Sequence, residues 1–155
     1  MNVRPMRLAD LRAVGKLAGA LVRQHHRTDP GRFMRIPHVE VGYATYFATQ
    51  LKSRKAVLRV AEERGRVVGY GYGALGARDW NMLLDAHGAV HDIVVAPGRR
   101  RLGVGRALMD EMVRALKDKG AERIVLSAMI GNRPAQRLFR AVGFRPTMLE
   151  MTINP

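Results

Sequence analysis

The chain has 155 residues, no cysteine and a formal net charge of +14. Its length suits a single domain over residues 1–155, large enough to bury about two-thirds of the unfolded chain's surface. The lack of cysteine excludes disulfides, a thiol nucleophile and thiolate zinc sites. No apolar run approaches the ~20 residues of a membrane span, and the first residues lack the apolar core of a signal peptide. We therefore expect a cytoplasmic protein without a membrane partner.

The positive charge comes mainly from arginine, with 22 arginines against 5 lysines. Such charge favours anionic partners, which include nucleic acid, acidic proteins and phosphorylated cofactors. The arginines are spread along the whole chain, and aromatic side chains for base stacking are few. We therefore do not expect nucleic acid to be the partner. The sequence leaves a homodimer open.

The first half of the chain predicts a strand, two helices and a hairpin. A short strand at Val3-Arg4 stops at Pro5, and a helix begins after Asp10. The turn-forming residues of Gln24–Pro37 predict a loop, which a second helix follows over Val39–Ser53. The loop contains two adjacent histidines, whose side chains point in different directions on any regular element. We assign no metal site to them, because further ligands at compatible spacing are missing.

The hairpin pairs a strand at Ala56–Glu62 with one at Val67–Leu75. In the second strand Gly69, Gly71 and Gly73 alternate with tyrosines and leave one face almost bare. A bare face admits a ligand or a closely packed helix, and the sequence does not choose between them. A loop over Gly76–His87 then leads to the central strand.

The central stretch, Val90–Leu116, predicts a strand, an arginine- and glycine-rich turn, and a helix. The strand ends at Ala96-Pro97-Gly98, and the helix repeats apolar residues at helical spacing from Val104 to Leu116. Backbone N–H groups at a helix start, together with the helix dipole and nearby arginines, favour a phosphate or pyrophosphate. A dinucleotide-binding fingerprint is excluded because Leu108 stands where its third glycine belongs, and a P-loop lacks its Gly-Lys-Ser/Thr.

The last part predicts a strand at Arg123–Met129, a helix that begins at Asn132 and ends at Gly143-Phe144, and a final strand at Met148–Ile153.

Two motifs resemble the GNAT N-acetyltransferase superfamily. The turn Arg100-Arg101-Leu102-Gly103-Val104-Gly105 matches its Q/R-x-x-G-x-G/A signature. The second motif, N-x-x-A-x-x-L-Y-x-x-x-G-F, is matched by Asn132, Ala135, Leu138, Phe139, Gly143 and Phe144, with phenylalanine in place of the tyrosine. The resemblance implies an α/β (α+β) fold with a mixed, mostly antiparallel sheet of about six to seven strands, splayed at the central strands and flanked by about four helices.

The resemblance also implies acetyl-CoA as cosubstrate, an amine acceptor and a set of binding residues. In the family the loop amides hold the CoA pyrophosphate, and the preceding strand pairs with the pantetheine arm. Residues expected to bind the cosubstrate are Ile93, Val94, Val95, Arg100, Arg101, Leu102, Gly103, Val104, Gly105, Arg106, Asn132 and Phe139.

The implied reaction is attack of an unprotonated amine on the thioester, which needs a proton acceptor and an oxyanion donor. His91-Asp92 stands where the central strand of relatives carries a carboxylate base, and the resemblance puts His91 at the place commonly taken by glutamate. Strand alternation predicts that only one of these two side chains faces the cleft. The oxyanion donor is expected to be the backbone N–H of Val94 or of a neighbour.

Two residues depart from the family pattern, and one is Arg101, where many relatives carry a small residue in the loop. The tyrosine that protonates the leaving thiolate is replaced by Phe139, which has no donor, so water or Ser127 would assist instead. Two alternatives to an N-acetyltransferase therefore stay open, a non-catalytic acyl-CoA sensor and a basic nucleic-acid-binding module on the same fold. The acceptor itself is not predicted.

Overall fold

The computed structural model describes residues 1–155 and contains one sheet with the strand order β1-β2-β3-β4-β5. The strands are β1 (Asn2–Pro5), β2 (Ala56–Glu63), β3 (Arg66–Gly76), β4 (His87–Val95) and β5 (Ile124–Leu126). Neighbours among β1 to β4 are antiparallel, whereas β5 runs parallel to β4. The predicted mixed, mostly antiparallel class is confirmed, but the sheet has five strands, fewer than the six or seven expected.

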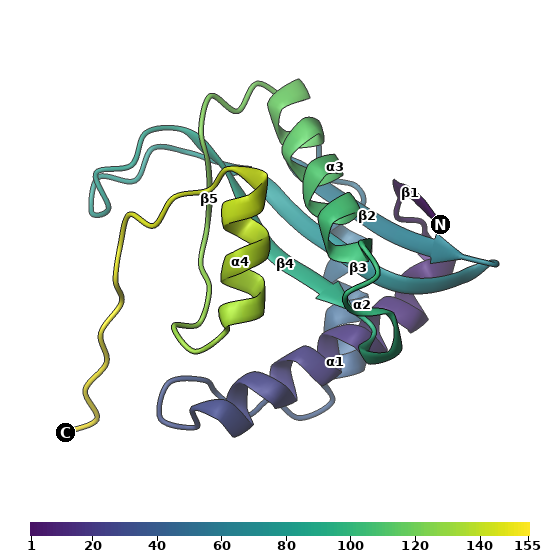
Figure 1. Cartoon of the computed structure of the whole chain (residues 1–155), viewed down its shortest axis with the longest axis horizontal. Coiled ribbons are helices and arrows are strands. Elements are labelled where there is room, and N and C mark those ends of the chain that lie inside the picture. The colour runs from purple at the N-terminus through teal and green to yellow at the C-terminus, as the bar shows by residue number, and fades with distance from the viewer.

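Two pairs of helices enclose the sheet (Figure 1). The helices α1 (Leu11–Thr28) and α2 (Val39–Gln50) cover one face, and α3 (Val104–Asp118) and α4 (Arg133–Val142) cover the other. Short 3-10 turns lie at Leu8–Asp10 and Pro97–Arg99. The helix α1 continues past Gln24, where a loop is predicted, because the turn-forming residues begin only at Asp29.

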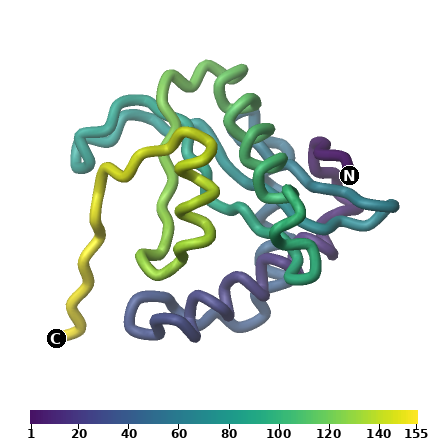
Figure 2. Tube along the Cα trace, viewed as in Figure 1, coloured from purple at the N-terminus to yellow at the C-terminus, as the bar shows by residue number.

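The prediction of a final strand at Met148–Ile153 is wrong. Residues 145–155 form no strand, and no backbone hydrogen bond joins them to the sheet. Figure 2 shows this segment running away from β5 and toward the connection between α1 and α2. Side chains hold it there, because Glu150 pairs with Arg32 and Asn154 Nδ2 donates to the Gly31 carbonyl at 3.0 Å. The partner strand is also short, since β5 has only three residues.

The bare glycine face of β3 is covered by α3, which settles one alternative left open by the sequence. A Cβ on Gly71 would lie 2.9 Å from both Cγ and Sδ of Met112, and one on Gly69 would lie 3.1 Å from Leu108 Cδ1. On the opposite face of the strand Tyr70 and Tyr72 are buried against the α1 and α2 layer. The glycines therefore admit a helix, and the tyrosines face the other side of the sheet.

A glycine also sets the distance between α1 and α2, which gives a stability prediction. A Cβ on Gly15 would lie 2.6 Å from the backbone oxygen of Glu40, so Gly15→Ala forces the helices apart. Overpacking costs about 1–3 kcal/mol, which exceeds the gain of about 1 kcal/mol from alanine in a helix. We expect thermal denaturation of Gly15→Ala at a lower temperature than wild type. Gly42→Ala on α2 is the control, because its Cβ meets nothing within 4 Å and it should melt slightly higher. A Gly15→Ala variant as stable as wild type would contradict this packing.

Candidate active site

The turn after β4 presents a run of unpaired backbone donors. The N–H groups of residues 101–106 donate to no backbone or side-chain acceptor, because α3 begins at Val104 and its first turn has no preceding carbonyls to use. Gly103 precedes the helix with φ of +82°, and Arg101 also has a positive φ of +63°. These left-handed conformations bend the chain so that the turn leads directly into the first residue of α3. At this N-terminus the helix dipole favours an anion.

The arginines of this turn differ in what they contact. Arg99 pairs with Glu63 at 2.6 Å, and Arg106 pairs with Asp110 at 2.9 Å while donating to the Ala141 carbonyl at 3.0 Å. Arg100 Nε donates to the Val95 carbonyl at 3.3 Å. Arg100 and Arg101 form no ion pair, so this turn offers a phosphate both its backbone N–H groups and two guanidinium groups.

Gly103 and Gly105 have different roles in the turn. A Cβ on Gly103 would meet nothing within 4 Å, whereas one on Gly105 would lie 3.1 Å from Leu138 Cδ2 of α4. Gly103 is thus required by its positive φ, and Gly105 by the close packing of α4 on α3. Val104 is buried, and Leu102 is exposed beside it.

The sheet splays beside the second half of β4, as predicted. β4 pairs with β5 only over Gly88–Val90, and β5 ends at Leu126. Beyond Val90 that edge of β4 has no strand partner, while its other edge stays paired with β3 as far as Val95. Ile93, Val94 and Val95 therefore lie at an edge that an extended ligand amide can use.

A β-bulge at His91 decides which side chains face the site. The register pairs Tyr72 with Asp92 but Gly73 with Val90, so His91 is the extra residue in β4. Val90 packs on the α3 side, whereas Asp92 and Val94 lie on the α1 and α2 side. The prediction that only one of His91 and Asp92 faces the cleft is wrong, because the bulge interrupts strand alternation and both line one cavity.

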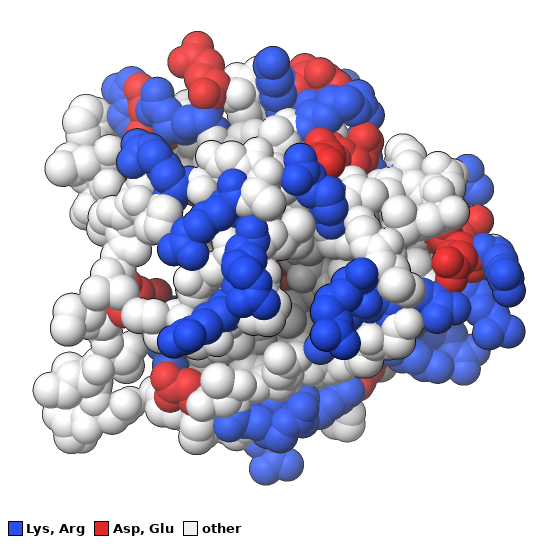
Figure 3. All heavy atoms as spheres, in the orientation of Figure 1, with Lys and Arg blue, Asp and Glu red and all other residues white.

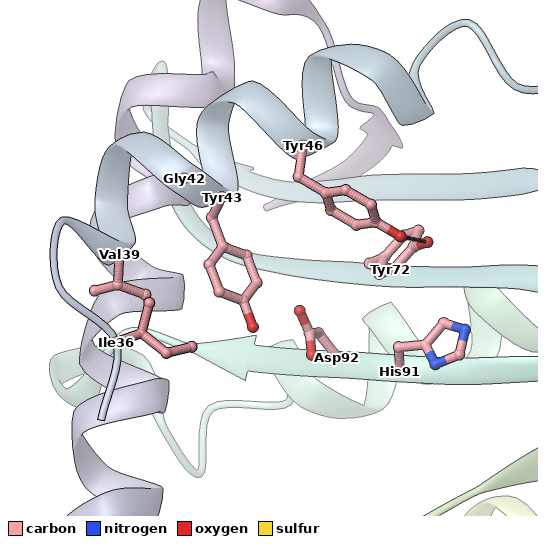
Figure 4. Close-up of a pocket in the computed structure, with 8 residues that line it drawn as sticks. All are labelled: Ile36, Val39, Gly42, Tyr43, Tyr46, Tyr72, His91 and Asp92. Atoms are coloured by element: carbon pink, nitrogen blue, oxygen red, sulfur yellow. Dashed lines mark hydrogen bonds between the residues drawn. The ribbon is translucent and has the colours of Figure 1, made fainter. Parts of the chain in front are cut away.

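This cavity, of about 380 Å³, lies between α2, β3 and β4 (Figure 4). It is lined by apolar and aromatic residues together with the two ionisable side chains of β4: Ile36, Val39, Gly42, Tyr43, Tyr46, Tyr72, His91 and Asp92. A second cavity of about 300 Å³ shares Ile36, Tyr43 and Asp92 with it and extends toward His25 and Arg32. Asp92 therefore stands where the two cavities meet.

The Asp92 carboxyl lies in a poorly solvated place. Its Oδ2 accepts a hydrogen bond from the buried Tyr70 hydroxyl at 3.0 Å, and no other group of the chain bonds to it. Burial raises the pKa of Asp92 above its usual range, against the opposing effects of the Tyr70 hydrogen bond and of His91 and His25. A raised pKa beside a cavity is typical of an acid–base group. His91 is exposed and lies against Tyr72, with ring centroids 5.2 Å apart.

The remaining predicted residues lie on or near α4. Asn132 caps this helix, since its side chain accepts from the Ala135 N–H at 3.2 Å, so helix geometry alone explains its place in the motif. Phe139 packs against Phe144 with ring centroids 6.3 Å apart. Ser127 is exposed just beyond the end of β5.

Sequence reasoning missed the aromatic lining and the arginines of α4. Tyr43 and Tyr46 come from a helix whose pairing with β3 has no local signal in the sequence. Arg133, Arg137 and Arg140 are exposed on α4. Figure 3 shows Lys and Arg side chains on both sides of a hollow on the face that carries α4 and the start of α3. Positive side chains thus flank this hollow, and others are spread over the rest of the same face (Figure 3).

The model of the Acetyltransferase (GNAT) family matches residues 21–144. The chain belongs to this family. An N-alpha-acetyltransferase of Sulfurisphaera tokodaii is 31% identical over 135 residues, which cover 80% of this chain and 79% of that protein. The predicted family resemblance is confirmed, and the family and its named relatives support acetyl transfer as the general activity.

Solved structures agree with this assignment at the level of the fold. A tetramutant protein of Bacillus halodurans matches this GNAT chain with a TM-score of 0.86 and 20% identity, covering 100% of both chains. An aminoglycoside N-acetyltransferase solved in complex with CoA matches with a TM-score of 0.75 and 18% identity, covering 99% of this chain and 93% of that one. None of the helices has both the length and the apolar character needed to cross a membrane.

Proposed function

We propose that this chain is a cytoplasmic, single-domain N-acetyltransferase that uses acetyl-CoA to acetylate the primary amine of a small molecule or protein. One observation carries the proposal: β4 leads into a turn of unpaired N–H groups, and its bulge places Asp92 in an apolar cavity. A phosphate-binding turn and a proton acceptor are thus fixed by one strand, as transfer from a phosphorylated carrier to an amine requires.

The residues present fit the cosubstrate. The N–H groups of residues 101–106 would hold the pyrophosphate, because six donors without partners gather at a helix start. The splayed edge at Ile93–Val95 would pair with the pantetheine arm, and Asn132 and Phe139 would border it from α4. When bound, acetyl-CoA supplies an acyl thioester that an amine can attack.

Asp92 would take the proton that the amine loses. Its Oδ2 is fixed by Tyr70, which leaves Oδ1 to accept a hydrogen bond from an ammonium group in the cavity. The raised pKa makes this carboxylate a better proton acceptor than an ordinary aspartate. His91 lines the same cavity and would relay the proton toward solvent, since it is exposed.

Two further groups complete the assignment. A backbone N–H of Val94 or a neighbour would donate to the negative charge that develops on the carbonyl oxygen. Phe139 has no proton to give, so water or Ser127 would protonate the leaving thiolate. Ser127 is exposed just beyond the end of β5.

Two measurements test the proposal together. Calorimetry with CoA should show binding, and release of free thiol should be seen when acetyl-CoA is mixed with a broad panel of amines. No binding at millimolar CoA overturns the proposal. Binding without thiol release would instead support the acyl-CoA sensor that Phe139 suggests.

A further inference from the structure

The lining of the cavity at Asp92 defines the class of acceptor. Among its eight residues Asp92 is the one carboxylate and His91 the one imidazole, and none is a lysine or arginine. This is unexpected in a chain of net charge +14. The lining therefore offers no lysine or arginine to a carboxylate or phosphate on the acceptor, and Arg32 of the adjoining cavity is already paired with Glu150. It offers one carboxylate, that of Asp92, to an ammonium.

The tyrosines present rings to the cavity because most of their hydroxyls are already bonded within the protein. The Tyr46 and Tyr72 hydroxyls lie 2.7 Å apart, and Tyr72 also donates to Gln50 Oε1 at 3.2 Å. Figure 4 shows these two rings meeting above the strand that carries Asp92 and His91. Saturated hydroxyls leave aromatic surface, which favours apolar groups and a nearby ammonium.

Only one hydroxyl of the lining is free. The Tyr43 hydroxyl makes no hydrogen bond within the chain and points toward Asp92 in Figure 4. Burial, and then the negative charge of Asp92, raise the pKa of Tyr43 to about 12, so it keeps its proton. The groups that can hydrogen-bond to an acceptor are thus gathered around Asp92, where the amine would sit. The rest of the cavity wall is apolar and includes Ile36 and Val39.

We infer that the acceptor is a primary amine carrying an uncharged aromatic or branched aliphatic group close to its nitrogen. The amine lies on Asp92, and its substituent fills the cavity bounded by Tyr43, Tyr46 and Val39. Acceptors with a carboxylate near the amine are disfavoured because no cation meets it. Acceptors with a second ammonium are disfavoured because that charge would be desolvated among apolar side chains. This inference rests on the proposed N-acetyltransferase function.

The test compares three amines at a fixed concentration of acetyl-CoA. Phenethylamine is uncharged apart from its amine, phenylalanine adds a carboxylate to the same skeleton, and 1,4-diaminobutane carries a second ammonium in place of the aromatic ring. We expect kcat/KM for phenethylamine to exceed that of either other amine by at least about tenfold, the effect of about 1.4 kcal/mol. Turnover of phenylalanine or 1,4-diaminobutane that equals or exceeds that of phenethylamine overturns the acceptor class while leaving the proposed function intact.

A cavity-filling variant tests the location. Gly42 lines the cavity and a Cβ there meets nothing within 4 Å, so Gly42→Leu is the variant chosen to reduce the cavity, and a cooperative melt checks that it folds. We expect its kcat/KM to fall about tenfold for phenethylamine and less for ethylamine. Val41→Leu is the matched control, since Val41 is exposed on the same helix and does not line the cavity.

An equal loss for both amines in Gly42→Leu overturns the assignment of the cavity to the acceptor's substituent. If CoA binds but no amine is acetylated, the proposed function fails. Calorimetry of phenethylamine with the CoA-bound protein then tests, without any reaction, whether the cavity binds an amine of the inferred class. Absence of that binding then overturns the inference too.

Discussion

Asp92→Asn is expected to lower turnover by at least about a hundredfold while leaving the dissociation constant of CoA unchanged. Asparagine keeps the shape of the side chain and still accepts from Tyr70, but it cannot take a proton from the amine. The CoA contacts proposed here lie at the turn after β4 and at its splayed edge. A selective loss of turnover therefore follows from the geometry, and thiol-release assays with calorimetry measure both quantities.

The pH dependence of Asp92 has a definite sign. Because burial raises its pKa in the fold, turnover should rise with pH through that raised value, and Asp92→Asn should lose this limb of the profile. The linked stability is fully present below the unfolded pKa of about 3.9 and is lost as pH rises through the folded value. At neutral pH Asp92→Asn should therefore melt at a higher temperature than wild type, and the difference should shrink in acid.

Asp118→Asn is the matched control, because Asp118 is 61% exposed and lies at the end of α3, far along the chain from the cavity. It should change neither turnover nor its pH profile. Full activity in Asp92→Asn would show that Asp92 is not the proton acceptor. A loss of turnover in His91→Ala alone would then assign that role to the exposed histidine.

The part of the site that is local in sequence could be predicted. The turn after β4 depends on a glycine with positive φ, on a proline before it and on a helix start, all of which lie within a few residues. The cap of α4 is likewise local, since Asn132 bonds to the N–H three residues on. Such features are specified by spacing, which a single sequence displays.

The cavity could not be predicted, because it depends on pairing between distant segments. The bulge at His91 exists only relative to β3, whose register shifts between Tyr72 and Gly73. Without that register, alternation places His91 and Asp92 on opposite faces of the strand. The contact of Tyr46 with Tyr72 likewise joins α2 to β3, and nothing near either tyrosine in the sequence announces the other.

In the last segment, residues 145–155, the sequence pattern favours a strand, but the sheet offers no neighbouring strand for it to pair with. Leu149, Met151 and Ile153 are apolar, alternate with polar residues and suit a strand, yet all three are strongly exposed. A strand needs an edge to pair with, and β5 is too short to provide one of matching length. Alternation predicts the propensity of this segment, whereas the sheet decides its conformation.

Gly103→Val should raise the dissociation constant of CoA by about a hundredfold or more. Gly103 has φ of +82°, a conformation in which valine is strongly disfavoured because its branched Cβ crowds the backbone. The turn must then change shape, and the N–H groups on either side no longer converge on one anion. Losing two charge-assisted contacts at about 1.5–3 kcal/mol each accounts for the factor.

The control for Gly103→Val comes from the same turn. Gly98→Val adds the same side chain where φ is not positive and where, as at Gly103, a Cβ meets nothing within 4 Å. It should bind CoA nearly as wild type does, so the pair separates backbone conformation from added bulk. A cooperative melt for both variants shows that each is folded. Wild-type CoA affinity in folded Gly103→Val would mean that the pyrophosphate does not bind at this turn, because the left-handed glycine is what aligns its unpaired N–H groups.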